Sequence, residues 1–292
     1  MSIDVLQDKI RKTKNPSMID LALNLSDIPD LLIRQEGCGV AAYGRFCREV
    51  LEKLRSTVPA VRIGFTAFAI LGPKGLEELV LTLQRAKELG YYVALEAPYI
   101  LSPMMASGVA EAVFGENALY PCDGLIVPAY PGSDVLKPFL SYVKDGKKDI
   151  FAVVRTSNKT APEIQDLLTG SRLVHTAAAD LINRFGADNT GKFGYARVSV
   201  VAGANSDQSL RNLRSKYPRL FLLLDDMDYS GCNAKICSYA FDKFGHGAVV
   251  CAGPTVTTAW KTAESDGADF AEAALAAAER MKKNLTRYVN IL

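Results

Sequence analysis

Apolar residues along this chain gather into eight short runs, and helical periodicity marks most of the segments between them. Within a run the apolar residues stand at successive positions and do not alternate with polar ones. Strands of this kind are covered on both faces, as in a parallel sheet. The pattern therefore predicts strands at residues 18–23, 60–65, 92–97, 125–127, 150–154, 197–204, 220–225 and 247–252.

The stretch 124–158 shows the repeating unit most clearly. An apolar strand leads through a Pro/Gly turn into a helix, and a charged turn leads into a second apolar strand that ends in Thr-Ser-Asn. We expect Ser133 and Asp134 to cap the helix, and Asp145 with Gly146 to close it. Helices are predicted at 3–12, 43–54, 74–89, 103–114, 135–143, 162–185 with a break near Thr169-Gly170, 209–216, 233–244 and 268–283.

The alternation of buried strands and helices predicts parallel β/α units, and eight such units close into a barrel. No linker or low-complexity stretch divides the 292 residues. We therefore expect a single (β/α)8 TIM barrel domain over residues 1–292, with a short N-terminal helix and a C-terminal helix. A doubly wound open sheet is the alternative, but it usually has a glycine-rich first turn, and none follows Leu23.

Net charge, apolar runs and cysteine spacing indicate which kinds of partner and cofactor to expect. A net charge of +2 gives no electrostatic reason to expect nucleic acid. No apolar run approaches the ~20 residues of a membrane-spanning helix, and no signal pattern begins the chain, so we expect a cytoplasmic protein without a membrane partner. The six cysteines lack metal-ligand spacing, and we expect reduced thiols with neither a metal nor a cofactor.

Charged residues at strand ends are the candidate chemistry, because the functional face of such a barrel lies at the carboxyl ends of its strands. Arg62 and Glu96 each interrupt an apolar strand, where a charge needs a partner to offset its desolvation. We predict an Arg62–Glu96 pair across the barrel mouth, either functional or purely structural. Asp225, Asp226 and Asp228 carry carboxylates suited to a cation, although we favour a solvated acidic loop.

Several motifs resemble one known family. They match, in order and spacing over about residues 14–260, the longer form of orotidine 5′-phosphate decarboxylase. The resemblance implies a (β/α)8 barrel that is usually a dimer, has its active sites near the subunit interface, and takes a pyrimidine nucleotide. The motifs are Lys14-Asn15-Pro16, Tyr130-Pro131-Gly132-Ser133-Asp134, Lys137-Pro138-Phe139-Leu140, Thr156-Ser157-Asn158 and Val201-Ala202-Gly203-Ala204.

The first two strands depart from the family pattern. The family's first strand ends in Leu-Asp-Pro, but an ungapped comparison from Asn15-Pro16 puts Ala22 at the acidic position, and a shift of two residues puts Asn24 there. The active-site lysine of the second strand is replaced by Arg62, which keeps the charge but not the shape.

The third strand has lost the family's catalytic motif. Where the family has Asp-x-Lys-x-x-Asp, this chain has Glu96, Pro98 and Leu101. In the family the lysine ammonium faces the developing carbanion and supplies the proton that replaces CO2. Proline carries no charge and no donor, and preorganised electrostatics of this kind are usually the largest catalytic effect.

The family's phosphate site is also altered. Its Pro-Gly-x-Gly-x-Gln-Gly-Gly segment after the seventh strand corresponds here to residues 225–231, which are rich in aspartate, and its Ser-Arg-Gly after the eighth strand corresponds to Gly253-Pro254-Thr255. An arginine is lost and carboxylates are gained, which would repel a phosphate dianion. The Thr156-Ser157-Asn158 turn persists; in the family it binds the pyrimidine ring, although a turn kept for packing is the alternative.

Three functions follow from these observations. The first is a divergent decarboxylase-like barrel that has lost that activity and binds a small molecule or a partner subunit, with a homodimer expected. The second is a different enzyme at the same mouth, and the third is genuine orotidine 5′-phosphate decarboxylation in UMP biosynthesis. Catalytic candidates are Arg62, Glu96, Tyr99 and Asp225, and ligand-binding candidates are Asn24, Arg155, Thr156, Ser157, Asn158 and Thr255.

Overall fold

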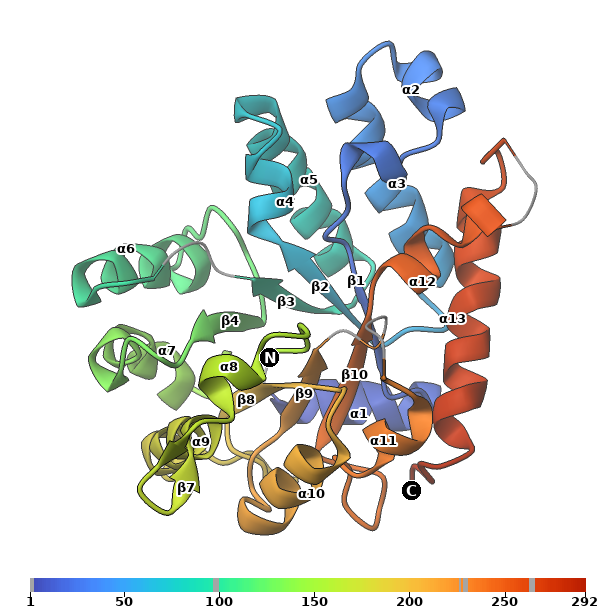
Figure 1. Cartoon of the computed structure of the whole chain (residues 1–292). Helices are drawn as coiled ribbons and strands as arrows, with labels where there is room; N and C mark the ends of the chain where they lie inside the picture. The colour runs from blue at the N-terminus through green and yellow to red at the C-terminus, as the bar shows by residue number, and fades with distance from the viewer. Residues whose placement is uncertain (1–2, 97–99, 226, 228–230, 263–265) are drawn as a thin grey trace.

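The computed structural model describes residues 3–96, 100–225, 227, 231–262 and 266–292. Within them, eight parallel strands close into a barrel in the order β1-β10-β9-β8-β5-β4-β3-β2, with helices outside (Figure 1). The predicted (β/α)8 fold is confirmed. The barrel strands are β1 (Ser17–Asp20), β2 (Ala60–Gly64), β3 (Tyr92–Glu96), β4 (Gly124–Pro128), β5 (Asp149–Arg155), β8 (Val198–Gly203), β9 (Leu222–Asp225) and β10 (Ala248–Ala252).

Burial on both faces explains the consecutive apolar residues of these strands. Every residue of β1, β8 and β10 is buried, because the barrel interior covers one face and the helices cover the other. β1 pairs with β10 on one side and with β2 on the other, so the first and last strands join. Closure leaves the barrel sheet without an unpaired edge.

Helices follow the strands and cover the barrel. Proline stands in the first turn of α5 and α6, where its missing N–H costs nothing. The longer helices are α1 (Ile3–Thr13), α2 (Asp30–Glu36), α3 (Gly39–Leu54), α5 (Pro73–Glu88), α6 (Pro103–Phe114), α9 (Val174–Gly186), α10 (Asp207–Lys216) and α13 (Phe270–Thr286). The shorter ones are η1 (Leu25–Asp27), α4 (Phe65–Ala69), η2 (Ser133–Val135), η3 (Lys137–Phe139), α7 (Leu140–Lys144), α8 (Pro162–Gln165), α11 (Ala234–Ser238), α12 (Pro254–Thr257) and η4 (Ala259–Thr262).

Two predicted helices are broken. The segment 135–143 begins with the 3-10 turns η2 and η3 and becomes α-helical only in α7. Pro138 lies within η3, and a proline there removes an N–H that a continuous α-helix would use. The segment 162–185 contains α8, a small antiparallel hairpin of β6 (Leu168–Thr169) and β7 (Arg172–Leu173), and α9. Gly170 has φ +63° at the hairpin turn, which explains the predicted break.

Other boundaries also differ from the prediction. β1 ends at Asp20, three residues before the predicted end at Leu23, and β2 ends at Gly64 because the chain turns directly into α4. The helix predicted at 233–244 is the shorter α11. The predicted helix closure is close to the observed one, since α7 ends at Lys144 and Gly146 has φ +74°.

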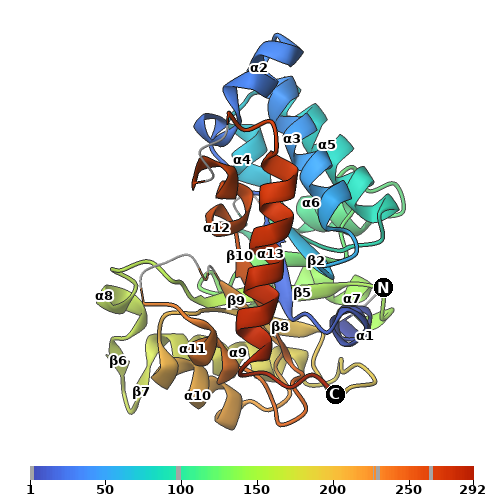
Figure 2. The ribbon, with the colours of Figure 1, turned by 90° about the vertical axis from the view of Figure 1, so that its right-hand side faces the viewer.

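The C-terminal residues contact the end of α1 and the residue after it, beside the amino ends of the strands. Figure 2 shows α13 running along the outside of the molecule near α3, with which it packs. Lys14 Nζ donates to the carbonyl of Ile291 at 2.7 Å, and Arg11 Nε donates to the carbonyl of Leu292 at 2.9 Å. In the part of the chain that the structure describes, no helix is long and apolar enough to cross a membrane.

Candidate functional site at the barrel mouth

A cavity of about 210 Å³ opens at the carboxyl ends of the strands. Among the described residues that line it, Arg62, Glu96 and Asp225 give it charge, Thr156 gives it a hydroxyl, and the others are apolar: Ile126, Val153 and Val201. These residues come from β2, β3, β4, β5, β8 and β9 and the turn after β5. Convergence of side chains from several strand ends at this face is the usual arrangement of a barrel active site.

Arg62 lies between two carboxylates. One of its terminal nitrogens pairs with Asp20 Oδ2 and the other with Asp225 Oδ1. The Arg62 side chain is only 11% exposed, so this guanidinium is almost completely removed from water. Burial alone would lower the pKa of Arg62, but the charges of Asp20 and Asp225 outweigh it and hold that pKa well above its ordinary value. Arg62 is therefore a permanent cation with both ends occupied.

The predicted Arg62–Glu96 pair is wrong, since no ion pair between described residues joins these two side chains, and strand register explains why. Asp20 is the register partner of Arg62 across the β1–β2 ladder, whereas Glu96 is level with Gly64, two residues farther along β2. Asp20 was missed because the first strand was predicted to end at Leu23. A charge inside an apolar run was the available signal, the same signal that identified Arg62.

Glu96 ends β3, and no hydrogen bond or ion pair between described residues engages its carboxylate. Its side chain is exposed, yet the protein around its carboxyl still removes part of its hydration. This desolvation raises the pKa of Glu96; Arg62 opposes the shift, and the negative charges of Asp20 and Asp225 add to it. Tyr99, the remaining catalytic candidate, lies outside the described residues, as do Pro98, Asp226 and Asp228.

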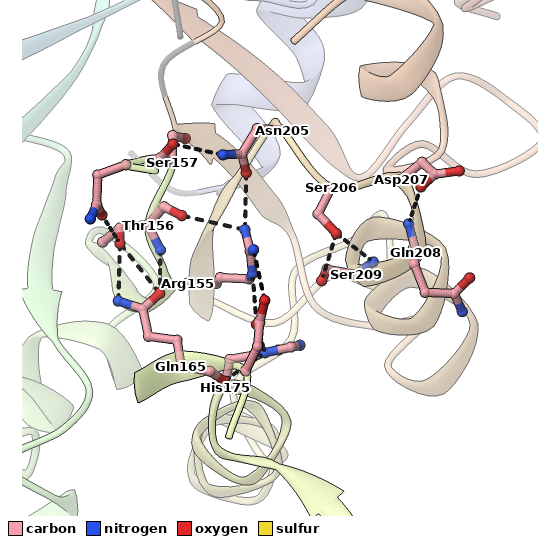
Figure 3. Close-up of polar contacts among 12 residues, drawn as sticks. Arg155, Thr156, Ser157, Gln165, His175, Asn205, Ser206, Asp207, Gln208 and Ser209 are labelled. Atoms are coloured by element: carbon pink, nitrogen blue, oxygen red, sulfur yellow. Dashed lines mark hydrogen bonds and ion pairs between the residues drawn. The ribbon is translucent and has the colours of Figure 1, made fainter. Parts of the chain in front are cut away.

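The turn after β5 is held by an extensive polar network (Figure 3). Arg155 is buried and donates through Nε and Nη2 to the two carboxylate oxygens of Asp166, each at 3.0 Å. Its Nη1 donates to Asn205 Oδ1 at 2.9 Å. Asp166 also lies 3.0 Å from His175 Nδ1. These contacts engage Arg155 within the protein, and the predicted ligand-binding arginine does not line the mouth cavity.

Thr156 and Ser157 have different surroundings. Ser157 is buried, and its hydroxyl donates to the carbonyl of Asp225 at 2.5 Å, so it fixes the turn to the end of β9. Thr156 lines the cavity, and Gln165 Nε2 donates to its hydroxyl at 3.0 Å. A Cβ at Gly203 would lie 2.6 Å from the Thr156 carbonyl oxygen, which accounts for the glycine of the β8 motif. Asn158 is exposed and donates to Thr160 at 3.0 Å.

Asn24 and Thr255 are not among the described residues that line the cavity. Asn24 is an exposed residue before η1, and its backbone N–H donates to Asp27 Oδ2 at 2.9 Å. Thr255 belongs to α12 and borders a separate cavity of about 180 Å³ that Met281 of α13 also lines. Among the described residues, no three His, Cys, Asp or Glu side chains are grouped to hold a metal ion.

Comparisons with known proteins find related chains that match this one over almost its whole length. No family model matches the chain. It is 27% identical over 293 residues to orotidine 5′-phosphate decarboxylase of Rhodopirellula baltica, covering 96% of this chain and 97% of that one. It is 25% identical to orotidine 5′-phosphate decarboxylase of Clostridium novyi, with 98% of each chain covered. The resemblance to the orotidine 5′-phosphate decarboxylase family is confirmed.

Solved structures agree on the fold. The OMP decarboxylase of Leishmania donovani superposes with a TM-score of 0.71 at 20% identity, covering 97% of this chain and 99% of that one. The orotidine 5′-monophosphate decarboxylase of Plasmodium berghei gives a TM-score of 0.74 at 13% identity, with the same coverage. At these identities the likeness supports the barrel architecture and says nothing about activity.

The structure sharpens the comparison with the decarboxylase pattern at the first strand. That pattern places an aspartate at the strand end, and the last residue of β1 here is Asp20. An aspartate therefore also ends the first strand here, two residues before Ala22, the residue that the ungapped comparison puts at the acidic position. The mouth thus combines Asp20 on β1, Arg62 on β2 and Glu96 on β3.

Proposed function

We propose that this decarboxylase-like barrel does not decarboxylate orotidine 5′-phosphate and binds an uncharged or cationic small molecule in its mouth. The observation that carries the proposal is the position of Arg62 between Asp20 and Asp225. Glu96 lines the same cavity, so the described residues of the mouth include three carboxylates and one guanidinium.

Decarboxylation would require a proton for the carbanion that CO2 leaves behind. Arg62 does not meet this need, because its pKa is raised well above the ordinary value and both of its ends are bound to carboxylates. The family's lysine position is Pro98 in this sequence. A neutral side chain without a donor removes the electrostatic stabilisation on which such a reaction depends.

Charge also disfavours the family's anionic ligand. Asp20, Asp225 and Glu96 outnumber Arg62 at the mouth, and pairing with two carboxylates neutralises the guanidinium locally. Like charges repel most strongly where water is scarce. A neutral or cationic ligand, with its apolar part against Ile126, Val153 and Val201, fits the same lining.

Two measurements test this proposal. We expect no CO2 release from orotidine 5′-phosphate above that of a sample without protein, and no growth of a pyrimidine-requiring strain that carries only this gene. In thermal-shift assays we expect UMP to leave Tm unchanged. Uridine, the matched analogue that lacks the phosphate, should raise Tm by at least as much as UMP does. A ligand that binds only the native state raises Tm, so clear stabilisation by UMP, or restored growth, would overturn the proposal.

The raised pKa of Glu96 favours a second candidate, a different enzyme at the same mouth. A carboxyl with a raised pKa is suited to general acid–base chemistry. For any activity found, Glu96→Gln and Arg62→Met should abolish it, while Glu163→Gln, on exposed α8, should not. Retention of activity by both mouth variants would reject this candidate.

We also propose a homodimer, which the resemblance to the decarboxylase family supports. Light scattering on a sizing column should give twice the 31.6 kDa of one chain. A monomer at all protein concentrations would contradict it.

A further inference from the structure

Two cysteines lie on either side of the first turn of α11, the helix that follows β9. Cys232 precedes the helix and is half-buried, whereas Cys237 belongs to the helix and is completely buried. No disulfide joins them in this structure, and neither is among the described residues that line the mouth cavity. The helix packs against α10 and α13 (Figure 2). The two thiols therefore form a pair of nucleophilic groups outside the mouth.

The cap of α11 fixes the relative positions of the two cysteines. Asn233 is the N-cap: its backbone is extended, with φ −160° and ψ 164°, and its side-chain oxygen accepts from the N–H of Ile236 at 3.0 Å. The N–H of Cys237 donates to the carbonyl of Asn233 at 3.0 Å, which closes the first turn. Cys232 thus occupies the position before the cap, and Cys237 occupies the fourth position of the helix. Apolar side chains at these two positions often pack against each other as a hydrophobic staple.

Burial makes the two thiols unequal. A cysteine thiol packs as a small apolar side chain, and Cys232 packs against the hydrophobic core to which Cys237 belongs. Burial raises the pKa of the Cys237 thiol to about 12, and the charge of a neighbouring Cys232 thiolate adds to the rise. Cys237 is therefore protected from oxidants in solution, whereas Cys232 is accessible to them.

We propose that Cys232 and Cys237 form a reversible disulfide when the protein meets a hydroperoxide. With hydrogen peroxide, the Cys232 sulfur attacks one oxygen, the O–O bond breaks, and the departing hydroxide takes the thiol proton and leaves as water, so that Cys232 becomes a sulfenic acid. The Cys237 sulfur then attacks the sulfur of this sulfenic acid, the S–O bond breaks, and the departing hydroxide takes the Cys237 proton as a second water. The two thiols lose two electrons, which the peroxide gains. A thiol reductant reverses the bond by exchange.

The position of the pair gives the bond a use. Asp225, which pairs with Arg62 in the mouth, ends β9, and Cys232 lies in the connection from β9 to α11. The disulfide ties the end of this connection to a buried residue of the helix. Where thiols are otherwise kept reduced, disulfides are usually transient and report oxidation. The pair therefore provides a redox-sensitive covalent contact directly after a strand that supplies the mouth.

Peptide mapping without reduction tests the proposal. Trypsin cleaves after Lys235, between the two cysteines, so the disulfide joins the peptides 220–235 and 236–243. The reduced protein is treated briefly with hydrogen peroxide, and the remaining thiols are then alkylated. We expect the joined peptides to account for most of the Cys232 recovered, and dithiothreitol should release the two peptides from each other.

Cys232→Ser should remove the joined peptides, and a circular dichroism melt shows that the variant is folded. Cys38→Ser is the matched control, because Cys38 is also partly exposed and directly precedes a helix, α3. It should give the same yield of joined peptides as the wild type. Oxidation of Cys232 to a sulfinic acid without the joined peptides, or pairing of Cys232 with a different cysteine, would overturn the proposal. A disulfide between two chains, seen as a dimer on a non-reducing gel, would overturn it as well.

Discussion

At the scale of single residues, the most consequential feature is the charge balance around Arg62. A buried guanidinium is stable in this barrel because Asp20 and Asp225 both contact it. The pairing leaves little capacity for an external anion, which supports a neutral or cationic ligand. Through these contacts Arg62 stabilises the fold of the mouth, and its side chain also lines the cavity.

Arg62→Met should therefore destabilise the protein. Removal of the cation leaves the carboxylates of Asp20 and Asp225 close together and unpaired, and breaking a buried pair costs about 3–5 kcal/mol. Urea unfolding at pH 7 measures the loss. Arg45→Met is the matched control: Arg45 also contacts two carboxylates, Glu36 and Glu49, but it is 39% exposed, and the cost there should be below about 1 kcal/mol. Equal losses would contradict the role given to burial.

The buried carboxyl of Asp149 should make the free energy of unfolding depend on pH. This first residue of β5 is completely buried, and Tyr92 donates to its carboxylate at 2.7 Å. Burial raises the pKa of Asp149 to about 7, against the opposing effects of the Tyr92 hydrogen bond and Arg197. The folded protein then binds the proton more tightly than the unfolded chain, so this group's contribution to the free energy of unfolding falls as pH rises from about 4 to 7 and is constant above.

Asp149→Asn removes this titration. Between pH 4 and pH 7, wild-type stability should fall relative to the variant by about 2–4 kcal/mol, since each pKa unit corresponds to about 1.4 kcal/mol. Urea unfolding across this pH range measures the difference. Parallel pH curves for the two proteins would show that Asp149 titrates normally.

At the scale of elements, side-chain contacts link the segment after β5 to the barrel. Asp166, just beyond α8, accepts hydrogen bonds from Nε and Nη2 of Arg155 at the end of β5 and contacts His175 of α9. The hydrogen bonds from Arg155 lower the pKa of Asp166. Its carboxylate therefore stabilises the folded segment above the ordinary pKa, and this contribution is lost as pH falls.

Asp166→Asn should loosen the segment 160–173 at neutral pH, because the neutral amide cannot replace a carboxylate that accepts two bonds from Arg155. Hydrogen exchange followed by mass spectrometry should show faster exchange there and little change in the barrel strands. Glu163→Gln, an exposed change in the same segment, should leave exchange unaltered. Faster exchange in both variants, or in neither, would contradict the importance of the Arg155 contact.

At the scale of the whole molecule, closure of the sheet joins distant parts of the chain. β1 pairs with β10, and α13 packs against α3, so the first and last quarters of the chain share one core. This arrangement favours a single domain over residues 1–292 that unfolds as one unit.

We accordingly expect one unfolding transition. The chain has a single tryptophan, Trp260, in η4 near the C-terminal helix. Its fluorescence and the far-ultraviolet circular dichroism of the whole protein should change at the same urea concentration, as two-state behaviour requires. Separate midpoints would indicate parts that unfold independently.

The sequence alone determined the barrel, because consecutive apolar residues identify strands covered on both faces and the helical segments between them impose parallel pairing. It also located Arg62, Glu96, Thr156 and Asp225 at strand ends, and these four line the mouth cavity. Only the tertiary structure decided which charges meet. The register of neighbouring strands, fixed by closure of the whole sheet, sets Asp20 level with Arg62 and moves Glu96 two residues beyond it. Periodicity along one strand carries no information about its register with the next.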